Sequence, residues 1–176
     1  MRKLKVTALS LVIGCIIVFG INACSKDDDG NGTASINLLL KDAPGDFQQV
    51  NVEVIDVQLH TSSGGWQTIP VNDSIYDLLL LRDSANAALG TAILPASNLS
   101  KLRLILGTQN TVMVDSVIYP LALSSQDETG LKININQSLN SGSIYTLVLD
   151  FDAAASVILE GNGTYRLKPV LKAEFQ

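Results

Sequence analysis

Cysteine, histidine and tryptophan are scarce in this chain of 176 residues, which contains two Cys, one His and one Trp. Cys15 lies in an apolar run near the start and Cys24 follows that run, so the remainder of the chain has no cysteine and needs to be stable without disulfides. His60 is the single histidine. These absences exclude histidine-based catalytic triads, thiol catalysis and typical zinc sites.

Long apolar runs are also absent beyond the first two dozen residues. There, Arg2, Lys3 and Lys5 precede an apolar stretch over residues 6–21 and then small residues, which is the organisation of an export signal. An uncleaved membrane anchor is the alternative, although the run is barely long enough to span a bilayer. The sequence therefore predicts a signal peptide at residues 1–23.

The residues at the end of this signal, Ile-Asn-Ala-Cys at 21–24, resemble the lipobox of bacterial lipoproteins, with Asn22 as a departure from the preferred residue. The resemblance implies that the signal is cleaved before Cys24 and that Cys24 is lipidated, with acyl chains such as palmitate. Two or more such chains anchor a protein to a membrane stably. Residues 24–33 then form a polar, glycine-rich tether with no apolar side chain to bury.

The tether carries Lys26, Asp27, Asp28 and Asp29 directly after the cysteine. An acidic run of this kind can serve only solubility and repulsion from anionic lipid. It also looks like the export signal that sends lipoproteins of Bacteroidota-type bacteria to the outer face of the outer membrane. We expect a lipid-anchored protein facing outward, with a periplasm-facing lipoprotein as the alternative.

Basic residues are few after the signal. Cleavage removes three of the 12 Lys and Arg residues and none of the 17 Asp and Glu, which leaves 9 against 17 and a net charge of −8. An acidic domain without a basic cluster in its sequence is a poor partner for nucleic acid. We therefore expect no nucleic-acid partner.

Residues 34–176 are long enough for one domain, and their apolar residues alternate with a period of two, which indicates strands. The apolar face changes parity near Ile55 and Asp56, which predicts a β-bulge there. Residues 75–81 and 144–151 are apolar on both faces and are expected to be central strands, whereas residues 84–90 are alanine-rich and are expected to form a short helical turn. About nine strands with turns between them predict an all-β sandwich, and a closed barrel is the alternative.

Several short segments together resemble a family of uncharacterised domains found mainly in Bacteroidota-type lipoproteins. They include Leu-Lys-Asp-Ala-Pro at 40–44, Gly-Trp at 65–66, Tyr-Asp-Leu-Leu at 76–79 and Leu-Val-Leu-Asp-Phe-Asp at 147–152. The resemblance spans residues 34–176. It implies an immunoglobulin-like or prealbumin-like sandwich on a lipid anchor, and it brings no known activity, cofactor or catalytic residue.

Carboxylates are the remaining candidates for chemistry. Asp42, Asp150 and Asp152 could together hold calcium if the first and penultimate strands end at the same edge. No regular spacing of a calcium loop is present, so the favoured interpretation is structural: Asp42 and Asp152 cap turns or helix ends, and Asp150 pairs with a basic residue such as Lys168. We predict no catalytic residue and no cofactor.

Trp66 and His60 have structural and functional interpretations as well. Trp66 is a core or edge staple or, alternatively, a platform on which a sugar ring stacks. His60 lies with Asp56 and Gln58 on the polar face of its strand, and exposure is favoured over a ligand role.

The sequence thus predicts a non-catalytic binding or accessory module whose partner is a glycan, a peptide or an outer-membrane protein. One alternative is a structural component that pairs through an exposed edge, notably the last strand. The other is an enzyme that uses carboxylates only.

Overall fold

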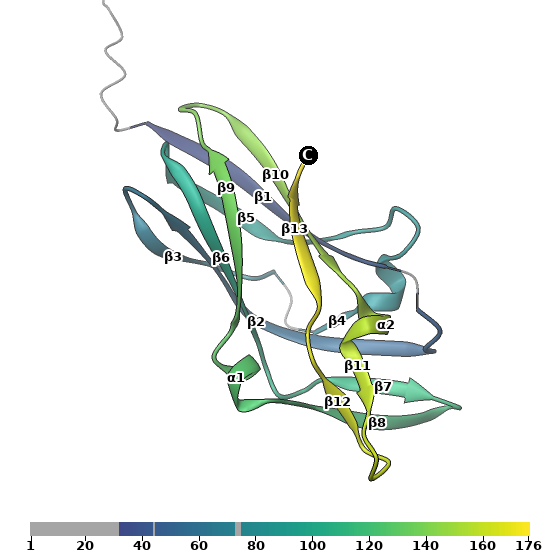
Figure 1. The fold of residues 1–176 in the computed structure, drawn as a ribbon. Coiled ribbons are helices and arrows are strands. Elements are labelled where there is room, and N and C mark those ends of the chain that lie inside the picture. The colour runs from purple at the N-terminus through teal and green to yellow at the C-terminus, as the bar shows by residue number, and fades with distance from the viewer. Residues whose placement is uncertain (1–31, 44, 73–74) are drawn as a thin grey trace, which may run out of the picture.

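The computed structural model describes residues 32–43, 45–72 and 75–176, and strands are the main secondary structure within them. Two mixed sheets face one another as a sandwich, which confirms the predicted fold class (Figure 1). The described residues form thirteen strands rather than about nine, in part because the apolar segment 165–175 is divided into two short strands that pair with different neighbours.

The smaller sheet has four strands in the order β13-β10-β1-β5. β1 and β10 are parallel, with Lys41 opposite Asp150, and the other two pairings are antiparallel. Both neighbours of β10 are strands, so the prediction of a central strand there is confirmed. The bounds are β1 Thr33–Asp42, β5 Ala87–Pro95, β10 Ile144–Phe151 and β13 Leu171–Phe175.

The larger sheet is organised around β2, Gln49–Thr61, which has partners along both sides. Its order is β11-β12-β8-β7-β2-β6-β9, and β3 and β4 also pair with β2. The bounds are β3 Gly65–Ile69, β4 Ile75–Asp77, β6 Asn98–Leu106, β7 Thr111–Val114, β8 Val117–Leu123, β9 Leu131–Ser138, β11 Val157–Leu159 and β12 Tyr165–Leu167.

The predicted bulge in β2 is confirmed. The register of β2 against β6 shifts between Val54 and Asp56, and Ile55 is exposed between them. On the N-terminal side of the shift β2 pairs with β4 and β7, and beyond it with β3 and β6. The extra residue therefore lets one long strand keep its apolar side chains inward while it changes partners.

Two local predictions were wrong. Residues 75–81 do not form one strand, because β4 ends at Asp77 and a 3-10 helix, η1 (Leu78–Leu81), follows. Asp77 caps this helix by accepting a hydrogen bond from the Leu79 backbone N–H. Four consecutive leucines satisfy either conformation, and the tighter turn buries Leu78 and Leu79 while it leaves Leu80 exposed.

The alanine-rich segment is not helical. A turn at Asp83 and Ser84, both with positive φ, leads into β5, which begins at Ala87. At Gly90, a Cβ would collide with the Pro70 backbone oxygen, so only glycine allows β5 to lie this close to that segment.

The chain passes between the sheets at the end of β10. Helix α2, Ala153–Ser156, links β10 to β11, and β12 continues into β13 through Pro169, as the yellow ribbon in Figure 1 shows. A further short helix, α1 (Ser125–Glu128), follows β8. The backbone N–H of Asp152 donates to the Val170 oxygen, which ties the two crossings together.

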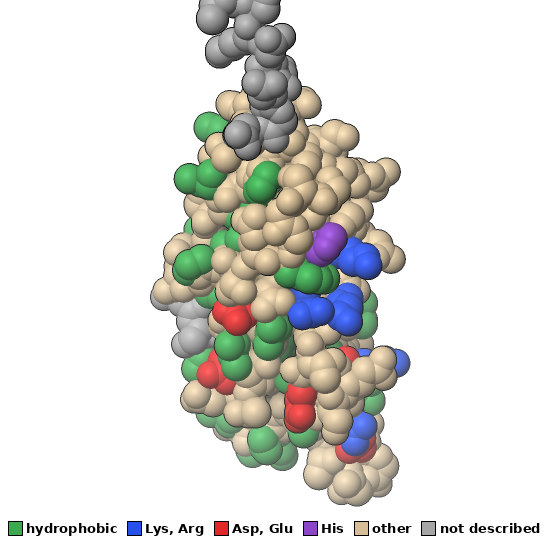
Figure 2. Space-filling model, turned by 90° about the vertical axis from the view of Figure 1, so that its left-hand side faces the viewer, with side chains coloured by type: hydrophobic (Ala, Val, Ile, Leu, Met, Phe, Trp, Pro, Cys, Tyr) green, Lys and Arg blue, Asp and Glu red, His purple; other side chains and the backbone are tan. Residues whose placement is uncertain are grey.

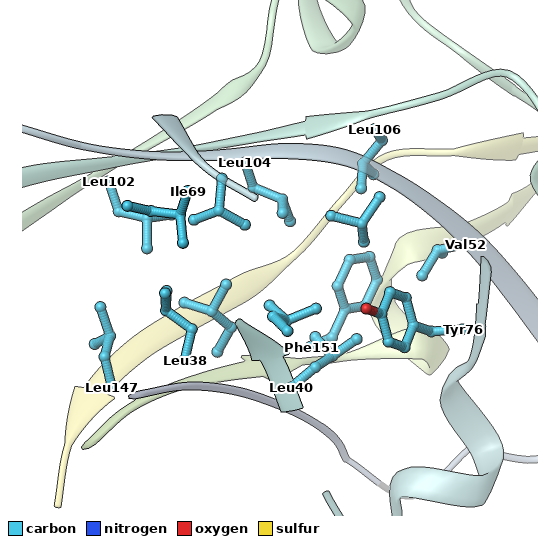
Figure 3. Packing of buried hydrophobic residues seen from close by; sticks show 14 of the residues in the cluster. Leu38, Leu40, Val52, Ile69, Tyr76, Leu102, Leu104, Leu106, Leu147 and Phe151 are labelled. Carbon is cyan, nitrogen blue, oxygen red and sulfur yellow. The ribbon is translucent and has the colours of Figure 1, made fainter. Parts of the chain in front are cut away.

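The inward side chains of both sheets fill the space between them. Leu38, Leu40, Leu147 and Phe151 of the smaller sheet face Ile69, Leu102 and Leu104 of the larger one (Figure 3). Asp42 continues the inward face of β1 beyond Leu40, so a carboxylate terminates the otherwise apolar inward row of this strand.

Candidate functional site

The three predicted carboxylates do come to one end of the sandwich. Because β1 and β10 are parallel and in register, their C-terminal ends meet at the same edge, with Asp42 opposite Phe151 and Asp152 one residue further on. Side chains alternate across a strand, however, so Asp42 points into the core and Asp150 points to the outer face. The juxtaposition is confirmed, but the three carboxylates do not share one face.

Asp42 is buried, with 5% of its surface exposed. Its Oδ1 accepts a hydrogen bond of 2.9 Å from the Ala153 backbone N–H, and its Oδ2 has no hydrogen-bond partner. The pKa of this carboxyl is raised from 3.8 to about 6, mainly by burial and in smaller part by the nearby Asp152, against the lowering effect of the Ala153 N–H and Arg82. The sequence pattern predicted the capping role but gave no indication of the burial.

Asp152 and Asp150 have structural roles too. Asp152 is the N-cap of α2, as predicted, and accepts from the Ala155 N–H at 2.8 Å. Asp150 pairs with a basic residue, as predicted, but the partner is Lys41, at 3.0 Å, and not the suggested Lys168, because the parallel register places Lys41 directly opposite. Within the described residues, no three His, Cys, Asp or Glu side chains are grouped to hold a metal ion.

A hollow of about 540 Å³ lies over the outer face of β1 and β10. Leu39 and Val148 contribute apolar surface, the Lys41 and Asp150 pair lies beside them, and the loop containing Ser84 forms one wall. Since the charges of Lys41 and Asp150 neutralise one another, no unpaired charged group of this pair is left to select a ligand.

A second candidate lies on the outward face of the larger sheet. Strand pairing places Trp66 opposite His60 and His60 opposite Lys101, and in the next row it places Arg103 opposite Lys132. We call these five residues the basic patch. Figure 2 shows this flank: blue Lys and Arg side chains gather beside the purple histidine, and red acidic side chains lie below them.

Contacts within the patch hold its central side chains in place. The Arg103 guanidinium carbon lies 4.5 Å from the centroid of the Trp66 ring, and Arg103 Nη1 donates to Gln58 Oε1 at 3.0 Å. His60 meets Trp66 edge to face, with ring centroids 5.1 Å apart, and its Nδ1 lies 2.9 Å from Ser100 Oγ. A cation over an indole face is an attractive arrangement that also fixes the orientation of both groups.

The patch corrects the expectation that the domain has no basic cluster. Lys101, Arg103 and Lys132 are spread over more than thirty positions, and antiparallel pairing of β6 with β9 brings them together. The sequence did contain one indication of the patch. Each of these charged residues alternates with apolar residues along its strand, so each is expected to point outward. His60 lies on the polar face as predicted, and Trp66, at 39% exposure, is at an edge strand and outside the core.

Several predictions fall outside the described residues. These are the signal peptide at 1–23, the lipidated Cys24 and the export residues Lys26, Asp27, Asp28 and Asp29. For the part of the chain that the structure does describe, no helix has the length and apolar character needed to cross a membrane.

A family model described as a domain of unknown function, DUF4382, matches residues 33–169. The chain belongs to this family. The match covers the sandwich as far as the segment before β13, and it confirms the expectation of an uncharacterised domain family. No curated protein matches this DUF4382 chain. Among solved structures, it is similar to the NMR structure of the protein from Eubacterium rectale, with 13% identity, coverage of 80% of this chain and 91% of the other, and a TM-score of 0.26.

Proposed function

We propose that this DUF4382 protein is a non-catalytic binding module, held by a lipid on Cys24 at the outer surface of an outer membrane, whose binding face is the basic patch. The observation that carries the proposal is the placement of Lys101, Arg103 and Lys132 together on a rigid sheet face of a chain with net negative charge. Such a placement favours a partner of opposite charge.

The alternative of a carboxylate-only enzyme has less support. Of the three candidate acids, Asp42 and Asp152 accept backbone hydrogen bonds and Asp150 is paired with Lys41. A carboxylate mechanism needs two acids that face a common cleft, and here the side chains of Asp42 and Asp150 point to opposite faces of one sheet.

Protease accessibility on intact cells tests the location. We compare the native protein with a variant in which Lys26, Asp27, Asp28 and Asp29 are alanine, and with Cys24→Ala. Digestion of the native protein, protection of the tether variant and loss of Cys24→Ala from the membrane fraction are the expected results. Protection of both the native protein and the tether variant until lysis would contradict outward exposure and favour a periplasm-facing lipoprotein.

A structural role through an edge strand is the second candidate. β13 pairs with β10 along one side, and it is the terminal strand of its sheet. An edge of this kind can pair with a strand of another chain. Sedimentation of the purified protein in neutral detergent separates the two functions: a monomer at micromolar concentration argues against self-assembly through this edge.

A further inference from the structure

We infer that the ligand of the basic patch is an acidic polysaccharide, a sugar polymer that carries carboxylate or sulfate groups. This inference rests on the proposed function, in which the patch is the binding face. It specifies the chemical class of the partner.

The three Lys and Arg side chains of the patch lie close together. Arg103 and Lys132 are directly opposite across an antiparallel pair, and Lys101 is two residues along β6 and diagonal to Lys132, so the three Cα atoms lie about 5 to 8 Å from one another. The ion pairs among the described residues, Lys41 with Asp150 and Arg166 with Glu160, involve none of the three. Their positive charge is therefore available to an external anion.

The nearest acidic position on β2 limits the extent of this surface. Asp56 pairs with Ile105, one row beyond the pairing of Gln58 with Arg103. The positive surface therefore extends from Arg103 and Lys132 toward His60 and Lys101, away from Asp56. A bound polyanion should follow this direction.

Aromatic and amide groups lie beside these cations. Trp66 offers an aromatic surface against which the C–H face of a sugar ring packs, and Arg103 and His60 hold the indole in place. The amide of Asn134 lies in the same row as Lys101 and has donors and an acceptor for hydroxyl groups, whereas the Gln58 amide is already bonded to Arg103 and Thr68. Ordered side chains of this kind lose little entropy on binding.

The composition of the patch favours a sugar polymer over other polyanions. Docking on an anionic membrane surface requires several apolar side chains beside the cations, whereas Trp66 is the one large exposed apolar side chain of this patch. Tight binding of duplex nucleic acid draws on many phosphate contacts, whereas this patch supplies three Lys and Arg side chains. A polymer with rings, hydroxyls and anionic groups matches all three kinds of side chain.

The test is a binding titration of the purified full-length protein in neutral detergent. The probes are polygalacturonate and dextran sulfate as acidic sugars, neutral dextran, and polyacrylate as a carboxylate polymer without sugar rings. We expect both acidic sugars to bind, neutral dextran to show no binding, and polygalacturonate to bind about tenfold more tightly than polyacrylate, because only the sugar makes ring and hydroxyl contacts.

Three variants assign the binding to the patch. The double variant Lys101→Gln/Lys132→Gln should weaken polygalacturonate binding about tenfold, and Trp66→Ala should remove the preference over polyacrylate. Lys168→Gln/Lys172→Gln is the matched control, since it removes two exposed cations outside the patch and changes net charge equally. Circular dichroism confirms that each variant is folded.

Equal binding of polyacrylate, or equal weakening by the control pair, would overturn the inference, because binding would then depend on charge alone. Patch-dependent binding to vesicles of phosphatidylglycerol in phosphatidylcholine, or to duplex DNA, that is tighter than polygalacturonate binding would also overturn it. Failure here is distinct from failure of the proposed function: a surface-exposed, lipidated protein that binds no acidic sugar refutes the ligand class alone.

Discussion

Asp42→Asn should make the protein more stable at neutral pH, because it removes a charge that the fold buries. The pKa of Asp42 is raised from 3.8 to about 6, mainly by burial. A difference of about two pKa units corresponds to about 3 kcal/mol in the free energy of unfolding. The amide side chain of the variant keeps an Oδ1 acceptor for the Ala153 N–H, so the link between β1 and α2 is retained.

The sign of the effect follows from proton binding. Between about pH 4 and pH 6 the folded protein keeps the Asp42 proton that the unfolded chain releases, so the stabilising effect of this proton is complete below pH 4 and is lost as the pH rises through 6. The asparagine side chain is neutral throughout. The stability difference between Asp42→Asn and the native protein should therefore grow with pH, from about 0.5 kcal/mol at pH 4 to about 3 kcal/mol at pH 7.5.

Urea unfolding at a series of pH values, followed by Trp66 fluorescence and circular dichroism, measures this difference. Asp150→Asn is the matched control on the neighbouring strand: it breaks the partly exposed ion pair with Lys41 and should lower stability at pH 7.5 by about 0.5 kcal/mol. A stability difference for Asp42→Asn that is constant from pH 4 to 7.5, or that reverses at high pH, would refute the reasoning.

Two further predictions concern the same end of the sandwich and its core. Asp152→Asn keeps an acceptor for the Ala155 N–H but removes the charge that raises the pKa of Asp42, so an NMR titration should place the Asp42 pKa below about 6, and an unchanged value would contradict the coupling. Phe151→Ala should lower the free energy of unfolding by about 3 to 5 kcal/mol because Phe151 is fully buried, whereas Ile144→Ala on the same strand, where the side chain is 74% exposed, should change it by less than about 0.5 kcal/mol in urea unfolding.

The sequence was most informative where one physical constraint determined the pattern. An inward side chain in a sandwich needs to be apolar, so the alternation in β1 and the change of parity at Ile55 predicted both the strands and the bulge. Asp115 and Ser116, both with positive φ, form the two-residue hairpin turn between β7 and β8. These features depend on a few neighbouring residues.

Predictions failed where a segment is compatible with two conformations, or where contacts with residues far away in the sequence determine the arrangement. The leucines at 78–81 can form a 3-10 turn as readily as a strand, and the small alanines at 87 and 88 fit an edge strand as well as a helical turn. The basic patch depends on the register between β6 and β9, and the burial of Asp42 depends on how α2 covers the end of β1. Neither arrangement can be read from one segment alone.

The register that creates the basic patch also makes a testable trade-off between stability and binding. Arg103 and Lys132 are like charges directly opposite one another, an arrangement that destabilises a sheet by about 0.2 to 1 kcal/mol relative to neutral pairs. Since neither side chain packs in the core, folding gives no reason for this pair, whereas binding of an anion does.

Lys132→Glu should therefore raise the free energy of unfolding by about 0.5 to 1 kcal/mol, because the cross-strand repulsion becomes attraction. The same change should weaken polygalacturonate binding more than Lys132→Gln does, since it places a negative charge within the patch. Urea unfolding and the binding titration on the same preparations measure both effects. A Lys132→Glu variant that is more stable and still binds the polymer as tightly would show that the repulsion in β6 and β9 is unrelated to the ligand, and the assignment of the patch would have to be abandoned.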